Sequence, residues 1–177
     1  MKLTAIDSNA LRYLIDASSG DYDPNSKDAG DPLLRDQKVA LMRLFLYVRE
    51  PLWMRRTPTV MAELNQIPNA LKRESLYVQA CIRVAPLGNF NLTAVNVRFQ
   101  ELKKHHNKHN DCRIVAEAET VVEQFVTYDH DLIKNLKPYA KIPIITPVAC
   151  WELADIRRGA RLFQRPSNWR GPEWWIW

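Results

Sequence analysis

Long hydrophobic runs, clustered cysteines and glycine-rich motifs are all missing from this sequence of 177 residues. Its apolar runs span a handful of residues, whereas a membrane-spanning helix needs about 20. The N-terminal segment also lacks the apolar core and small-residue cleavage site of a secretory signal. We therefore expect a cytoplasmic protein that is not associated with a membrane.

Few cysteines and glycines are present, and their spacing excludes several classes of protein. Cys81, Cys112 and Cys150 are an odd number at wide spacing, which favours reduced thiols over a disulfide framework. The five glycines form neither the GxGxxG pattern of dinucleotide-binding folds nor the GxxxxGK pattern of a phosphate-binding loop. Neither type of nucleotide site is expected.

Charge is distributed unevenly along the chain. The whole sequence has 25 basic and 20 acidic side chains, a net charge of +5, but residues 43–108 hold 11 basic and only 4 acidic ones. A basic central segment could bind a polyanion such as a nucleic acid. It could equally be a solvated surface of lysine and arginine, so charge alone leaves both interpretations open.

Short β-prone runs alternate with segments of helical periodicity. Strands are predicted at residues 2–6, 52–56, 124–128 and 141–146. Helices are predicted at 10–17, 37–49, 58 to about 68, 69–84, 91–106, 111–122, 131–137 and 147 to about 158, with a turn at 85–88. No tight hairpin joins the strands. We therefore expect an α/β fold, a three-layer α/β/α sandwich with a parallel sheet of about five strands.

Two segments interrupt this alternation within a single domain of residues 1–177. Residues 18–35 are polar and contain Gly and Pro, which predicts a loop insertion. Residues 166–177 form an aromatic C-terminal tail that contains four of the six tryptophans. Tryptophans there could stack on single-stranded bases, although packing on an apolar surface of this chain or of a partner is the commoner use.

Carboxylates fall where the predicted strands end. Asp7 follows the first strand and Asp129 follows the strand at 124–128, while Glu63 and Asp111 lie early in helices. The carboxyl ends of adjacent parallel strands border one ligand-binding crevice, although an Asp can also simply cap its helix. Four carboxylates in one crevice at pH 7 would require protonation or a cation, and oxygen ligands favour Mg²⁺ or Mn²⁺.

Five segments follow one another in an order seen in a known family: LTAIDSNALRYLIDA, TPTVMAELNQI, NDCRIVAEAE, FVTYDHDL and IPIITPVACWELA. Together they resemble the PIN-domain ribonucleases, in particular the VapC-like toxins of prokaryotic toxin–antitoxin pairs. The resemblance implies a PIN-like fold and an Mg²⁺- or Mn²⁺-dependent endoribonuclease that cleaves RNA to leave a 5′-phosphate and a 3′-hydroxyl. It also implies a cognate antitoxin that covers the acidic pocket, and a homodimer.

The same resemblance assigns the site residues. The catalytic and metal-binding acids would be Asp7, Glu63, Asp111 and Asp129, with Asp131 as an additional metal ligand. We expect Asp7 and Asp129 to be the principal ligands, because strand ends are the most rigid positions available. Asn9 and Thr127 would form hydrogen bonds to these carboxylates or to the scissile phosphate.

Four basic residues are candidates for contacts with RNA phosphates: Arg55, Arg56, Lys103 and Lys104. Phosphate contacts position a substrate without reading its sequence, but single basic side chains are more often plain surface charge. A non-catalytic RNA-binding or scaffolding module with the same fold is the alternative to an enzyme. The presence of all four family acids favours the enzyme.

A histidine-rich segment, HHNKHNDC, precedes the predicted helix at 111–122. It groups His105, His106 and His109 with Cys112. The pair His105 and His109 is spaced to share one helical face and could hold zinc. No second well-spaced ligand pair is present and neighbouring lysines oppose a cation, so a polar helix end is the favoured interpretation.

Overall fold

Five parallel strands form one sheet in the described residues of the computed structural model, which are 2–18, 32–47 and 53–154. The strands are β1 (Thr4–Ile6), β2 (Met54–Arg56), β3 (Ala85–Pro86), β4 (Gln124–Val126) and β5 (Ile144–Ile145). Their order across the sheet is β3-β2-β1-β4-β5, and every neighbouring pair is parallel. β1 is therefore the central strand, buried on both faces.

The register of the central strands determines which chain ends meet. Ala5 of β1 lies opposite Arg55 of β2 on one side and Phe125 of β4 on the other. Because β1 and β4 are adjacent and parallel, the segments that leave their carboxyl ends start side by side at one edge of the sheet. The adjacent strand ends are the arrangement that Asp7 and Asp129 need in order to share one crevice.

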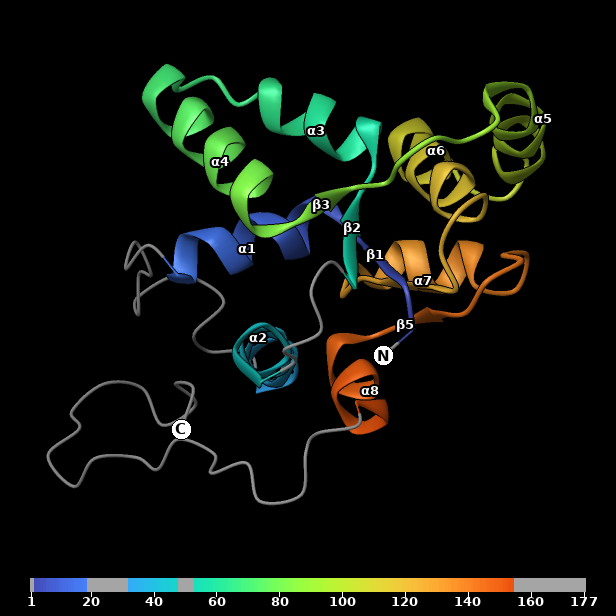
Figure 1. The fold of residues 1–177 in the computed structure, drawn as a ribbon. Coiled ribbons are helices and arrows are strands. Elements are labelled where there is room, and N and C mark those ends of the chain that lie inside the picture. The colour runs from blue at the N-terminus through green and yellow to red at the C-terminus, as the bar shows by residue number, and fades with distance from the viewer. Residues whose placement is uncertain (1, 19–31, 48–52, 155–177) are drawn as a thin grey trace, which may run out of the picture.

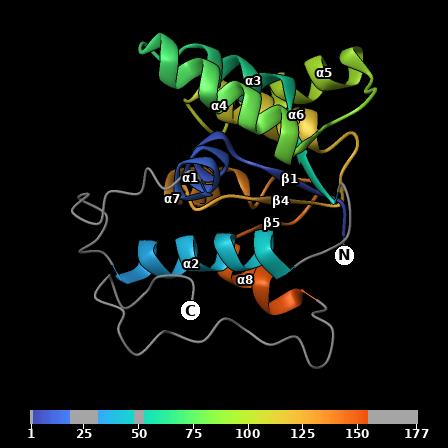
Figure 2. The same cartoon turned by 60° about the vertical axis from the view of Figure 1, so that its left-hand side comes forward.

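Helices cover both faces of the sheet (Figure 1). They are α1 (Ser8–Ser18), α2 (Pro32–Tyr47), α3 (Pro58–Asn65), α4 (Ala70–Arg83), α5 (Leu92–Leu102), α6 (His109–Ala118), α7 (His130–Leu136) and α8 (Pro147–Leu153). Figure 2 shows α3, α4, α5 and α6 on one side of the strands and α2 and α8 on the other. The predicted three-layer α/β/α sandwich is confirmed. No helix in the described ranges has the length and apolar character needed to cross a bilayer.

Local sequence explains where several helices begin. The Oγ1 atoms of Thr57 and Thr146 accept hydrogen bonds from backbone N–H groups in the first turns of α3 and α8. Each threonine is followed by a proline, whose missing N–H costs nothing at the first helical position. In α6, by contrast, the helix starts at His109, two residues before the predicted start at Asp111. Lys108 occupies its N-cap position without a side-chain capping bond.

Two expectations about connecting segments are corrected. The predicted turn at 85–88 contains β3, an edge strand that pairs with β2; Pro86 is tolerated there because an edge strand leaves one row of N–H groups unpaired. The predicted loop at 18–35 contains the start of α2, since Pro32 occupies a favoured position for beginning a helix. Residues 19–31 and the 166–177 tail lie outside the described residues.

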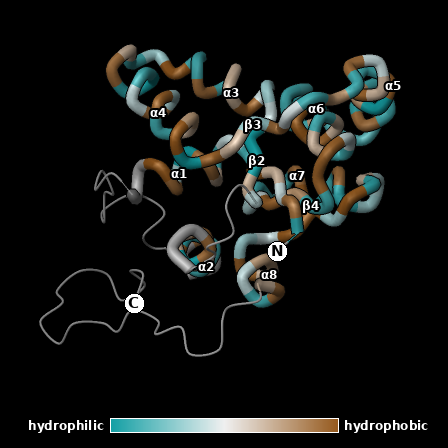
Figure 3. The backbone as a smooth tube through the Cα atoms, viewed as in Figure 1, coloured by the Kyte–Doolittle hydropathy of each residue, from teal (hydrophilic) through white to brown (hydrophobic). Residues whose placement is uncertain are grey.

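The core lies between the sheet and the inner faces of the helices. Ile6 and Phe125 of the central strands are fully buried, as is the apolar face of α6 that includes Ile114 and Val115. Figure 3 shows hydrophobic and hydrophilic residues alternating along the helices, as expected when one face of each helix is buried. The rigid central strands thus support whatever lies at their carboxyl ends.

Candidate active site

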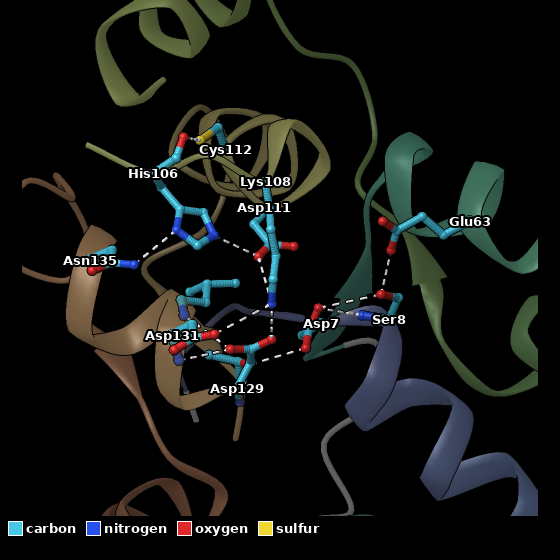
Figure 4. A network of polar contacts seen from close by, with 12 residues as sticks. Asp7, Ser8, Glu63, His106, Lys108, Asp111, Cys112, Asp129, Asp131 and Asn135 are labelled. Carbon is cyan, nitrogen blue, oxygen red and sulfur yellow. Dashed lines mark hydrogen bonds and ion pairs between the residues drawn. The ribbon is translucent and has the colours of Figure 1, made fainter. Parts of the chain in front are cut away.

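Four acidic side chains gather at the carboxyl edge of the sheet (Figure 4). Asp7 directly follows β1 and Asp129 lies three residues beyond β4, while Glu63 comes from α3 and Asp111 from the first turn of α6. The negative charges of Asp111 and Glu63 both act on Asp7. The structure therefore brings together residues that are far apart in the chain; Asp7 and Asp129 are separated by 122 positions.

Asp7 is the most buried of these acids, with 3% of its surface exposed. Its Oδ1 accepts a hydrogen bond from the backbone N–H of Ser8 at 2.7 Å, and its Oδ2 accepts one from the hydroxyl of Thr127 at 3.0 Å. Burial raises the pKa of Asp7 to about 7, and the charges of Asp111 and Glu63 add to this rise; the two hydrogen bonds oppose it. Asp7 is thus a buried carboxyl group whose ionised form is destabilised by its surroundings.

Ser8 links Asp7 to the more distant Glu63. Its hydroxyl donates a hydrogen bond to Oε2 of Glu63 and lies 3.4 Å from Oδ1 of Asp7. No role for Ser8 was predicted from the sequence. Its position directly after a strand-end aspartate was the available signal, since the backbone N–H groups there face the carboxylate.

Asp129 differs from Asp7 in its protonation. It is the N-cap of α7, and its Oδ1 accepts hydrogen bonds from the backbone N–H groups of Asp131 at 2.9 Å and Leu132 at 3.0 Å. Burial alone would raise the pKa of Asp129, but the Leu132 N–H and the Lys108 ammonium outweigh burial and lower it below its ordinary 3.8. Asp129 is therefore ionised at neutral pH.

Thr127 connects the two strand-end acids. Its hydroxyl donates to Oδ2 of Asp7, and the same Oγ1 atom accepts the backbone N–H of Asp129 at 3.0 Å. This agrees with the expectation that Thr127 supports the carboxylates through hydrogen bonds. The side chain is fully buried, so the distance between the two acids is maintained by the protein interior.

Lys108 is a functional candidate that the sequence analysis missed. Its ammonium group lies 3.2 Å from Oδ2 of Asp129, 3.9 Å from Oδ2 of Asp131 and 4.0 Å from Oδ2 of Asp111. The hydrogen bond to Asp129 is the main reason that the pKa of Lys108 is raised. A positive charge from the chain itself thus lies among three of the five predicted metal ligands.

A buried histidine orients Asp111. The His106 side chain is fully buried; its Nε2 lies 2.8 Å from Oδ2 of Asp111, and its Nδ1 lies 3.1 Å from Nδ2 of Asn135. An amide NH₂ can only donate, so in this arrangement Nδ1 accepts from Asn135 and Nε2 presents its N–H to Asp111. His106 therefore donates to Asp111 and holds that carboxylate toward the site.

Replacing His106 with alanine should lower the free energy of unfolding by about 2 kcal/mol, because two polar partners in partly buried positions would lose their hydrogen bonds. Replacement with glutamine should cost less, since the glutamine amide can place a donor near the position of Nε2. Urea denaturation of both variants measures the difference. Equal losses for alanine and glutamine would contradict the proposed donor role.

The remaining predicted residues lie around the site and have other contacts. Asn9 is exposed, and its backbone carbonyl accepts a hydrogen bond from the Tyr128 hydroxyl at 3.1 Å. The guanidinium groups of Arg55 and Arg56 donate to backbone carbonyls, Arg55 to that of Pro86 at 3.3 Å and Arg56 to that of Ala80 at 3.2 Å. Arg55 therefore joins β2 to β3, and Arg56 joins β2 to α4.

Of the two lysines predicted to contact RNA, Lys103 lies 5.3 Å above the ring of Phe99, and Lys104 is exposed. In the described ranges neither has an ion pair with the acidic cluster, in contrast to Lys108. Lys104 therefore remains available to solvent and to a ligand.

The histidines considered for zinc do not converge. His105 stacks on Tyr139 with ring centroids 3.5 Å apart, whereas His109 packs edge-on against Phe99 at 6.3 Å. Cys112 is fully buried, and its thiol lies 3.5 Å from the backbone carbonyl of His106. The favoured interpretation of this segment as a polar helix end agrees with these contacts.

The donor set of the acidic cluster suits a hard divalent cation in its chemistry, because carboxylate oxygens are the ligands that Mg²⁺ and Mn²⁺ prefer. As the side chains lie, however, no three His, Cys, Asp or Glu groups among the described residues are spaced to hold one metal ion. Their oxygens instead accept hydrogen bonds from Ser8, Thr127 and Lys108. An ion would have to replace some of these bonds.

Comparisons of the chain with protein families, curated proteins and solved structures find no match.

Proposed function

We propose that this protein is a metal-dependent endoribonuclease of the PIN-domain kind. The proposal rests above all on Asp7, a buried carboxyl group at the end of the central strand that Asp111 and Glu63 repel. A divalent cation would relieve this repulsion and allow Asp7 to ionise. The order of motifs that resembles VapC-like toxins extends the proposal to a toxin that a cognate antitoxin restrains.

Asp7 and Asp129 would be the principal ligands of the cation, because Thr127 and the start of α7 hold both carboxylates in place. Glu63, Asp111 and Asp131 would complete the ligand shell, in part through water. When bound, the metal would supply a hydroxide nucleophile at neutral pH and neutralise charge on the phosphate.

The chain's own side chains would prepare the site for this reaction. The N–H of Ser8 and the hydroxyl of Thr127 fix the orientation of the Asp7 carboxylate, and His106 fixes that of Asp111. Fixed donors and acceptors need no reorganisation during the reaction, which is a main source of catalytic power. The excess of basic side chains in residues 43–108 would attract the RNA backbone.

Cleavage of a fluorescent single-stranded RNA tests the proposal directly. The wild-type protein should cleave it with Mg²⁺ or Mn²⁺ and not with EDTA, and Asp7→Asn should reduce the rate about 100-fold or more, as expected for loss of a group that stabilises the reacting charge. Glu74→Gln, which alters an exposed acid on α4, is the matched control and should retain activity. Metal-independent cleavage, or equal rates for wild type and Asp7→Asn, would refute the proposal.

A further inference from the structure

We propose that the stacked rings of His105 and Tyr139 form an aromatic platform that binds one unpaired base of the RNA substrate. The inference rests on the proposed function, because it places part of the RNA beside the acidic site. It adds a contact with a nucleobase to the phosphate contacts expected of basic side chains.

The two rings of the aromatic platform lie face to face on the surface of the protein. Their centroids are 3.5 Å apart and their planes differ by 13°. His105 is exposed, and 47% of the surface of Tyr139 is exposed. A stacked pair uses one face of each ring, and the exposure of both residues leaves surface for a third aromatic ring. Bases of single-stranded nucleic acids stack on aromatic side chains presented in this way.

Backbone hydrogen bonds hold both residues in place. The N–H of His105 donates to the carbonyl of Leu102 at 2.9 Å, and the N–H of Tyr139 donates to that of Leu136 at 3.0 Å. The carbonyl of Tyr139 also accepts a hydrogen bond from the guanidinium of Arg98. A base would therefore meet rings that are already arranged, so that little conformational entropy is lost on binding.

The aromatic platform adjoins the acidic site through His106 (Figure 4). This residue directly follows His105, and its ring bonds both Asp111 and Asn135. Asn135 lies on α7, and Tyr139 follows the same helix. The two segments that carry the rings are thus joined to each other and to Asp111. An RNA strand with a base on the platform would therefore pass close to the acidic cluster.

Positive charge surrounds the rings. Lys104, Lys137 and Lys141 each lie within two positions of one of the rings, and all three are exposed. Glu101, an acid of the same region, forms an ion pair with Arg98 at 2.7 Å. The Arg98 hydrogen bond is the main cause that lowers the pKa of Glu101, and the charges of Lys141 and Lys104 contribute, so lysines of both segments lie near one point. Stacking surface together with positive charge is what proteins use to bind single strands.

Binding of two fluorescein-labelled oligomers to the full chain in EDTA, measured by fluorescence anisotropy, tests this inference. One is single-stranded oligoadenylate RNA, and the other is an abasic ribose-phosphate chain of the same length. Tyr139→Ala should weaken the binding of oligoadenylate about fivefold or more, the lower end of what one stacked base contributes, and leave the affinity for the abasic chain unchanged. His105→Ala should have the same selective effect, whereas Tyr139→Phe, which keeps the ring, should bind like the wild type.

Two further variants are controls. Tyr77→Ala removes a tyrosine of similar exposure, 39%, from α4. That helix leads into β3, whereas Tyr139 precedes β5 at the opposite edge of the sheet, so both affinities should be unchanged. Lys104→Ala should weaken both oligomers alike, because a phosphate contact does not depend on the base. Circular dichroism verifies that each variant is folded.

The outcomes separate this inference from the function on which it rests. Equal affinity of the wild type for the two oligomers would overturn the aromatic platform. So would a loss in Tyr139→Ala and His105→Ala that is as large for the abasic chain as for oligoadenylate, or no loss in either. Because EDTA removes the metal, none of these results bears on metal-dependent cleavage, and failure of the cleavage assay would leave them unchanged.

Discussion

Replacing Asp7 with asparagine is expected to stabilise the metal-free protein at pH 8 by about 3 kcal/mol. The rise of the Asp7 pKa from its ordinary 3.8 to about 7 corresponds to about 4 kcal/mol spent on ionising a buried carboxyl group. Asparagine avoids that cost. The amide nitrogen of asparagine cannot accept the hydrogen bond that the Thr127 hydroxyl donates to Asp7. We expect the loss of this bond to reduce the stabilisation by about 1 kcal/mol.

The pH dependence identifies the cause. Between pH 4 and pH 7 the unfolded chain releases the Asp7 proton while the folded protein keeps it, so folding takes up a proton. The free energy of unfolding of the wild type should therefore fall as the pH rises through this range. The advantage of Asp7→Asn should be greatest above pH 7 and disappear near pH 4, as measured by urea denaturation in EDTA.

Asp129→Asn is the matched control, because the pKa of Asp129 is lowered. Its ionised form stabilises the fold above the unfolded pKa, and this contribution is lost as the pH falls through the folded pKa. Asn is an equally good helix N-cap, so the substitution chiefly removes the interaction with Lys108. It should destabilise the protein at pH 8, and this effect should shrink as the pH falls below 3.8 and the carboxylate becomes protonated in the folded protein as well. A stabilising Asp129→Asn, or a destabilising Asp7→Asn, would show that charge burial does not govern this site.

Replacing Glu117 with alanine should lower the free energy of unfolding by about 3 kcal/mol. Glu117 is 2% exposed, and its carboxylate accepts the backbone N–H of Thr59 at 3.1 Å, the Thr59 hydroxyl at 2.7 Å and Nε of Arg113 at 3.3 Å. Removing a buried hydrogen-bonded carboxylate leaves these donors without their partner. Chemical denaturation of wild type and variant gives the value.

The same substitution should weaken Mn²⁺ binding, although Glu117 lies outside the acidic cluster. It connects α6 to the first turn of α3, and these two helices carry Asp111 and Glu63. Glu117→Gln retains an acceptor for Thr59 and should preserve both stability and Mn²⁺ affinity better than alanine. If both variants bound Mn²⁺ like the wild type, the α3–α6 connection would have no part in positioning the acids.

Sequence alone was sufficient for features that depend on neighbours along the chain. Thr57 with Pro58 predicted the start of α3, and Pro147 predicted that of α8, because capping and the first helical turn depend on residues a few positions apart. The alternation of strands and helices predicted the parallel sheet. It also placed Asp7 directly after one strand and Asp129 shortly after another, with Glu63 and Asp111 early in helices, and the resemblance to a family then assigned all four acids to one site.

The same local rules failed where pairing decided the structure. The 85–88 segment contains residues typical of turns. Ala85 and Pro86 nevertheless pair with β2 and form the edge strand β3. The start of α6 at His109 could not be predicted from capping residues either. Its N-cap residue, Lys108, makes no side-chain capping bond, and its ammonium group instead forms an ion pair with Asp129. Packing and charge outweighed local preference at both places.

Only the tertiary structure decided which polar groups meet. Ser8 bonds Glu63 across 55 positions and Lys108 bonds Asp129 across 21, and His106 forms a hydrogen bond with Asp111. Periodicity and capping describe the path of the chain over a few residues. Contacts between distant side chains, and the burial that raises the pKa of Asp7, depend instead on strand order and on how α3 and α6 pack.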